Sequence, residues 1–235
     1  MAAVTAEILI DEGFGETRAL LLLNGRPERL LYQRDDDRPQ ERLGARLAGR
    51  LVRIERAAGV AFFDGGDGAS LAASPHAVQG LSEGALAELE VTAEPRAGKA
   101  AAVRVIGPAT GYPRLLAPGP SPLERLKACA PAAEVLTGPS TRDEIDAAEA
   151  LALAPEARLP GGGSVKVERT RALTAVDVDA GAGTGQGDPR RAALTANRAA
   201  LAEAARLIRL AGLGGLIVVD LIGRRQDAAP ILKAA

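Results

Sequence analysis

A strand, a helix and a second strand follow one another near the carboxyl end of this chain, and this order leaves few possible folds. The apolar run 172–176 ends at Asp177, the apolar run 215–219 ends at Asp220, and helical spacing fills residues 190–210 between them. A crossover of this kind is almost always right-handed and brings two parallel strands side by side. Because the carboxyl ends of parallel strands open on one edge of a sheet, we expect both aspartates to face one cleft.

Two carboxylates in one cleft repel each other unless a cation lies between them. A hard divalent ion held by few carboxylates and several waters is typically Mg²⁺, so the pair predicts a magnesium site and metal-assisted phosphoester cleavage. Asp179 stands two residues after Asp177, and strand alternation places both side chains on one face. It is either a third ligand or a polar strand end.

The composition favours packed cores and excludes several kinds of site. The 235 residues are 47% hydrophobic, and the net charge of −1 predicts that any nucleic-acid contact comes from a local basic patch. The lone Cys129 excludes an internal disulfide and a cysteine zinc site within one chain, and the lone His76 argues against histidine catalysis. The first residues lack a signal peptide, and no run reaches the length of a spanning helix, so we expect a cytoplasmic protein.

Turn and strand signals divide the chain into parts. Strands are predicted at 7–11, 18–23 and 29–33, with Asn24-Gly25 as a hairpin turn. Short strands at 50–56, 60–64, 87–93 and 100–106 have the close spacing of a small barrel. Prolines then interrupt the chain, and we expect a linker with helices at 123–128 and 142–152.

The predicted barrel contains two adjacent aromatic residues, Phe62 and Phe63, of which alternation sends one inward and one outward. An exposed aromatic ring on a small barrel can stack unpaired bases, although both rings could equally belong to the core. Several cations could contact phosphates or form an ordinary solvated face. They are Arg42, Arg46, Arg50, Arg53, Arg56 and Lys99.

The Gly-rich segment 181–187 suggests a phosphate-binding loop at first sight. It fits neither the dinucleotide-binding spacing nor the lysine-bearing P-loop, so nucleotide binding is the weakest hypothesis. We expect a flexible connection beside the acidic site.

Several blocks of the chain, read in order, resemble the ribonuclease E/G family of bacterial endoribonucleases. The strongest are 158–164 (RLPGGGS), 172–178 (ALTAVDV), Asn197 and the stretch from Leu210 to Asp220. Residues 16–18 are similar to the family's opening, and 61–64 and 98–100 fall on its barrel pattern. The resemblance implies a multi-part α+β fold: an N-terminal β segment at 1–38 (the RNase H-like part), an OB-type RNA-binding barrel at 39–106, a linker with a reduced sensor region at 107–157, and a deoxyribonuclease-I-like α/β catalytic segment at 158–235.

The resemblance also implies a function. Asp177 and Asp220 would bind Mg²⁺, and a metal-activated water would cleave single-stranded RNA gripped by Phe62 and Lys99. Beyond what the resemblance implies, we expect Asp179 to assist catalysis. This chain has Asp179 where the family has Asn, and Gly223 where the family usually has an acid. The chain stops soon after Asp220, so we expect a fragment or a reduced relative. A cysteine–zinc link between subunits is not expected, while a homo-oligomer stays open. The alternative function is a non-catalytic RNA-binding protein.

Overall fold

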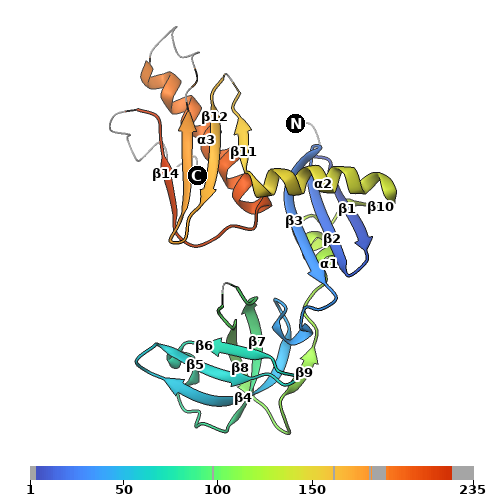
Figure 1. Ribbon diagram of the computed structural model, residues 1–235, viewed down its shortest axis with the longest axis vertical. Coiled ribbons are helices and arrows are strands. Elements are labelled where there is room, and N and C mark those ends of the chain that lie inside the picture. Colours follow the sequence, from blue (N-terminus) through green and yellow to red (C-terminus); the bar gives the residue numbers. More distant parts are fainter. Residues whose placement is uncertain (1–3, 97, 161, 180, 182–188, 224–235) are drawn as a thin grey trace. The chain divides into compact units, whose positions relative to one another are not determined.

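The computed structural model describes residues 4–96, 98–160, 162–179, 181 and 189–223 (Figure 1). The chain divides into two compact units, of which one joins residues 1–32 to 126–235 and the other comprises residues 33–125. The second unit is therefore an insertion that follows the third strand of the first. Strands and helices together make the fold a mixed α+β one.

The inserted unit contains a closed barrel of five strands. They are β4 (Arg46–Glu55), β5 (Val60–Asp64), β6 (Ser70–Ala73), β7 (Leu86–Ala93) and β8 (Ala101–Pro108), with two short 3₁₀ helices, η1 (Pro39–Glu41) and η2 (Pro75–Val78). The ring closes in the order β4, β5, β6, β8, β7, because β4 pairs with both β7 and β5. Such a closed barrel is compatible with the predicted OB type.

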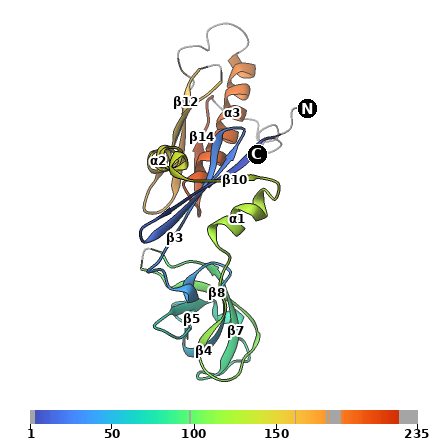
Figure 2. The same cartoon turned by 90° about the vertical axis from the view of Figure 1, so that its right-hand side faces the viewer.

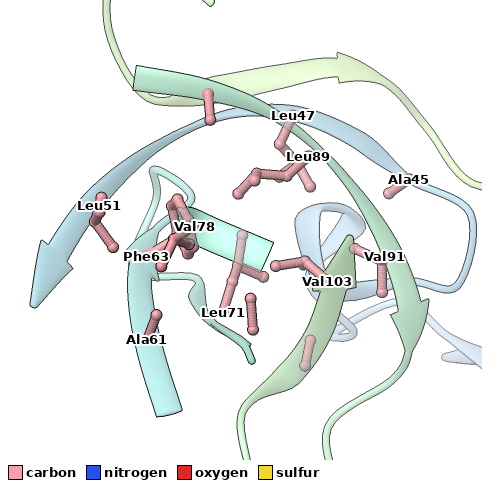
Figure 3. Close-up of a cluster of buried hydrophobic side chains, with 13 residues drawn as sticks. Ala45, Leu47, Leu51, Ala61, Phe63, Leu71, Val78, Leu89, Val91 and Val103 are labelled. Atoms are coloured by element: carbon pink, nitrogen blue, oxygen red, sulfur yellow. The ribbon is translucent and has the colours of Figure 1, made fainter. Parts of the chain in front are cut away.

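The barrel is filled by aliphatic side chains and one aromatic ring (Figure 3). Phe63 is 2% exposed and lies among leucines that include Leu47, Leu71 and Leu89. The strands alternate, so each second residue enters this core while its neighbours face outward. Strand β6 was not predicted, because its sequence Ser-Leu-Ala-Ala has little β propensity and only its pairing with β5 and β8 defines it.

The inserted unit also takes in residues on both sides of the range predicted for the barrel. Strand β9 (Arg114–Ala117) pairs with β4, within the region expected to be a linker. The chain then passes so close to Leu43 that a Cβ on Gly119 would lie 2.3 Å from the Leu43 carbonyl oxygen. Only glycine fits there, so the segment after β9 is part of the packing of this unit.

The first sheet of the other unit has the strand order β10, β1, β2, β3. Its strands are β1 (Ala6–Gly13), β2 (Glu16–Leu23), β3 (Arg26–Arg34) and β10 (Glu134–Thr137). Asn24 and Gly25 have φ angles of 50° and 70°, as a tight hairpin turn requires, so the predicted hairpin is confirmed. Helix α2 (Pro139–Leu153) contributes Ile145 and Ala148 to the core of this sheet.

Helix α1 (Pro122–Cys129) precedes β10 and begins with a reciprocal cap. The Ser121 hydroxyl accepts a hydrogen bond from the Glu124 amide at 3.2 Å, and the Glu124 carboxylate accepts one from the Ser121 amide at 2.7 Å. Two amide groups at the helix start are thereby satisfied. Both α1 and α2 lie close to the ranges predicted for helices.

The second sheet carries Asp177 and Asp220. Its strands are β11 (Glu156–Arg158), β12 (Ser164–Arg169), β13 (Thr174–Asp179) and β14 (Ile217–Asp220), in that order, and helix α3 (Pro189–Leu210) crosses from β13 to β14 (Figure 2). Val165, Val167 and Val176 point to α3 and are buried with its Ala200, Ala204 and Leu207. One face of the sheet is therefore covered by α3, and the alternate residues occupy the other face.

A buried ionic cluster ties the first sheet to α2. Asp11, which is 8% exposed, accepts hydrogen bonds from Arg18 at 2.6 Å and from Arg142 at 3.0 Å. Arg18 also donates to Asp146 and Glu149 of α2. The hydrogen bonds from Arg18 and then Arg142 lower the pKa of Asp11 below its ordinary value.

We predict that Asp11→Asn lowers the free energy of unfolding by about 1–3 kcal/mol at pH 7, because it removes charge-assisted hydrogen bonds from a buried group. A lowered folded-state pKa gives stability that is present above the ordinary aspartate pKa and is lost as the pH falls through the folded value. Urea unfolding at pH 7 and pH 3 checks both points. The exposed Asp143→Asn serves as the control, and equal losses in the two variants would contradict the prediction.

Candidate functional site

Asp177 and Asp220 are direct neighbours on adjacent parallel strands. The register pairs Thr174 of β13 with Ile217 of β14 and ends with Asp177 opposite Asp220. Both aspartates are exposed and lie on the sheet face opposite α3, because the alternate residues Val176 and Val219 face that helix. The predicted parallel pairing and shared edge are thus found, with the two acids one strand spacing apart.

A row of charged side chains continues from this pair across the sheet. Lys166 of β12 is opposite Asp177, and Glu156 of β11 is opposite Lys166. The Lys166 ammonium pairs with the Glu168 carboxylate at 2.6 Å, and this hydrogen bond is the main reason that the pKa of Lys166 is raised. Lys166 was not among the site residues predicted from the sequence, although alternation around the buried Val165 and Val167 could have placed it on the same face as Asp177.

Asp179 faces the same side as Asp177 but lies beyond the end of β14 in the register. Its carboxylate accepts a hydrogen bond from the Gly181 amide at 3.1 Å. In the described ranges, no three Asp, Glu, His or Cys side chains gather closely enough to hold a metal ion. The donor set is therefore the Asp177–Asp220 pair, which suits an ion that keeps most of its waters, such as Mg²⁺.

A buried amide holds the chain just after Asp220. Asn197 of α3 is fully buried, and its side chain donates to the Ile222 carbonyl and accepts from the Ile222 amide, each at 3.0 Å. The Asn197 side-chain amide thus bonds both backbone groups of Ile222, as a residue on a neighbouring strand would. Asn197, which belongs to the motifs quoted for the resemblance, thereby ties the end of β14 to the helix that crosses from β13.

We predict that Asn197→Ala destabilises the protein by about 1–3 kcal/mol, because both bonds to the Ile222 backbone are lost from a buried site. Hydrogen exchange of the Ile222 amide should also become faster. Thr195→Ala, at an exposed position of the same helix, is the control and should change stability by less than about 0.5 kcal/mol. Unchanged exchange at Ile222 would show that other contacts hold this segment.

The structure separates the two barrel phenylalanines as alternation predicts. Phe63 enters the core, whereas Phe62 is partly exposed on the outer face, where the Arg53 guanidinium lies 4.7 Å from its ring centre. The register sets Phe62 beside Ala72, which in turn is beside Ala102.

Lys99 is exposed in a turn before β8, where its backbone pairs with Arg96. The arginines considered with it are mostly engaged locally. Arg42, Arg46, Arg50 and Arg53 each bond a carbonyl or a carboxylate of the same unit. These contacts favour the solvated-face interpretation for most of that set.

Two further expectations concern the Gly-rich segment and the lack of a membrane-spanning helix. Of the Gly-rich segment 181–187, only Gly181 is among the described residues, so the nucleotide hypothesis lies outside them. Within the described ranges, none of the helices combines the length and the apolar character that crossing a membrane requires.

Comparisons with known proteins single out the segment that carries the aspartates. Residues 129–231 match the sequence model of the Ribonuclease E/G family. Ribonuclease E of Haemophilus influenzae is 45% identical over 76 residues, or 32% of this chain and 8% of the relative, and Ribonuclease E of Escherichia coli is 43% identical over 76 residues, or 32% and 7%. A Ribonuclease E/G-like protein, chloroplastic, of Arabidopsis thaliana is 46% identical over 72 residues, or 30% and 7%. The matches thus cover less than a tenth of these relatives. Residues 129–231 are thus similar in sequence to the ribonuclease E/G family.

Proposed function

We propose that this protein is a magnesium-dependent endoribonuclease that cleaves single-stranded RNA in RNA processing or decay, in the cytoplasm. The observation that carries the proposal is the register of Asp177 opposite Asp220 on the open face of the second sheet. The relatives named ribonuclease match part of this chain, and the family segment contains both aspartates. These facts support phosphodiester hydrolysis at this sheet edge.

In this proposal Asp177 and Asp220 hold the metal ion. Like charges on neighbouring strands destabilise a sheet, so a cation between the two carboxylates relieves a cost that folding imposes. Bound Mg²⁺ supplies an activated water and a Lewis acid for the phosphodiester. Lys166, next in the row, would contact a phosphate oxygen of the RNA, and Asp179 would assist by fixing the turn at Gly181.

The proposal also extends to the fold types of the barrel and of the family segment. We assign the barrel as an OB-type RNA-binding domain and segment 158–235 as the deoxyribonuclease-I-like catalytic part. Phe62 would stack on an unpaired base, in the manner of exposed rings on such barrels, and Lys99 would approach the RNA backbone. The partly exposed Phe62 ring and the exposed Lys99 side chain support these roles.

We predict that Asp177→Asn and Asp220→Asn each reduce magnesium-dependent cleavage of a 5′-labelled, A/U-rich single-stranded RNA by at least about 100-fold, since each removes one of two metal ligands. RNA affinity should hold or rise, because one negative charge is lost. Cleavage gels with Mg²⁺ and with EDTA check the first point, and filter binding checks the second. Asp143→Asn is the matched charge control.

The alternative, a non-catalytic RNA-binding protein, gives a different result in the same experiment. It expects RNA binding without cleavage in the unaltered protein and in both aspartate variants. If the Asp177→Asn variant still cleaves RNA, the assignment of Asp177 as a metal ligand is wrong.

For the barrel, we predict that Phe62→Ala weakens single-stranded RNA binding by about 1–3 kcal/mol, the range for loss of one base stack. Lys99→Ala should weaken binding to all sequences and reduce the slope of log affinity against log salt by about one phosphate contact. Fluorescence anisotropy at several salt concentrations measures both. Phe62→Tyr keeps a ring and is the control, so equal losses in Phe62→Tyr and Phe62→Ala would argue against stacking.

A further inference from the structure

A cavity that the aspartate pair does not line lies in the unit that contains both sheets. Its volume is about 620 Å³, and it is lined by β3, by β11 with the loop that follows, and by α3. Its charged lining residues are Arg26, Glu28, Arg158, Glu203, Arg206 and Arg209. The volume falls in the range of small-molecule sites, and it exceeds that of a single phosphate ion.

Four arginines face two glutamates in this lining, so the cavity keeps a surplus of positive charge. Glu203 is buried and is bound by Arg206 and Arg26, with closest distances of 2.6 and 2.7 Å. Glu28 pairs with Arg209 at 2.7 Å. Arg206 is also buried and donates to the Pro27 carbonyl, so its role is to hold the wall together.

Arg26, Arg158 and Arg209 have guanidinium N–H groups that bond no described residue. The Arg158 side chain is exposed and makes no ion pair or hydrogen bond with any part of the chain that the structure describes. Arg26 and Arg209 each bind their glutamate through one terminal nitrogen, and a guanidinium carries five N–H donors. Unused planar donors around a positive cavity match the oxygens of a phosphate group.

We propose that this arginine cavity binds a phosphate group carried by a ligand of about nucleotide size. Arg158 of β11 would supply the main charge-assisted contact, and Arg26 of β3 and Arg209 of α3 would add donors. The phosphate could come from a free mononucleotide or from an RNA strand, since both offer the same oxygens and charge.

The cavity is a separate site from the aspartate pair. The α3 residues Ala200, Ala204 and Leu207 pack on the covered face of the second sheet, whereas Asp177 and Asp220 occupy the other face. The arginines of the cavity need no metal ion at the aspartates to bind a phosphate group, so binding can be measured without Mg²⁺.

The test is calorimetric titration of the whole chain with AMP, and with adenosine as the probe that lacks phosphate, in low-salt buffer free of phosphate and Mg²⁺. We expect AMP to bind and adenosine to bind at least tenfold more weakly. Arg158→Ala should weaken AMP binding about tenfold, the effect of one charge-assisted hydrogen bond. Arg198→Ala, an exposed arginine of α3 outside the cavity, is the matched control and should bind as the unaltered protein does.

A variant that should bind AMP more tightly shows that the effects on affinity do not come from misfolding. Glu28→Gln keeps the size of the side chain, releases Arg209 and removes a negative charge, so it should tighten AMP binding about threefold. Added salt should weaken binding in every variant with an intact cavity. If AMP binds, an equal affinity for adenosine, or equal effects of Arg158→Ala and Arg198→Ala on AMP binding, would overturn the proposal.

A competition experiment distinguishes the two sources of phosphate. Single-stranded RNA that displaces bound AMP would identify the RNA strand as the occupant, and AMP that stays bound in saturating RNA would identify a small ligand. If AMP does not bind at all, the proposal survives only if RNA affinity falls with Arg158→Ala and rises with Glu28→Gln. Loss of cleavage in the aspartate variants has no bearing on any of these outcomes.

Discussion

The parallel pairing of β13 with β14 is the constraint on which the candidate site depends. A parallel pair needs a long crossover, and α3 supplies it while covering one face of the sheet. Because the side chains alternate, the valines that bury α3 force Asp177 and Asp220 onto the open face. A shift of one residue in either strand would turn its aspartate into the core, so the hydrophobic packing itself fixes the acidic pair.

The open face combines like-charge repulsion between Asp177 and Asp220 with a backbone that is held in place. Two carboxylates lie side by side with no ion pair to a described residue, and Lys166, the nearest cation in the row, is already engaged by Glu168. At the same time Asn197 clamps the backbone at Ile222, which limits the freedom of the strand end to relax away from the repulsion. A site held rigid against like-charge repulsion is suited to accept a cation.

Much of this could be read from the sequence. Local rules predict three features that the structure also has. They are the alternation of apolar residues around Asp177 and Asp220, the hairpin turn at Asn24-Gly25, and the opposite directions of the Phe62 and Phe63 rings. The elements that were missed are short strands such as β6 and β10, which have weak local preference and exist because a neighbouring strand pairs with them. Lys166 was missed for a related reason, since a single lysine on a strand has no meaning until its neighbour is known.

The residue pattern alone predicts the strands of Asp177 and Asp220, the helix between them and the segment's similarity to the ribonuclease E/G family, because these features depend on periodicity and on local motifs. Three other features emerge only from the folded chain: Lys166 lies beside Asp177, Asn197 reaches Ile222, and four arginines from β3, β11 and α3 line one cavity. They could not be predicted because each contact joins separate segments of the chain. Their geometry is set by packing across the whole unit, which local preference does not encode.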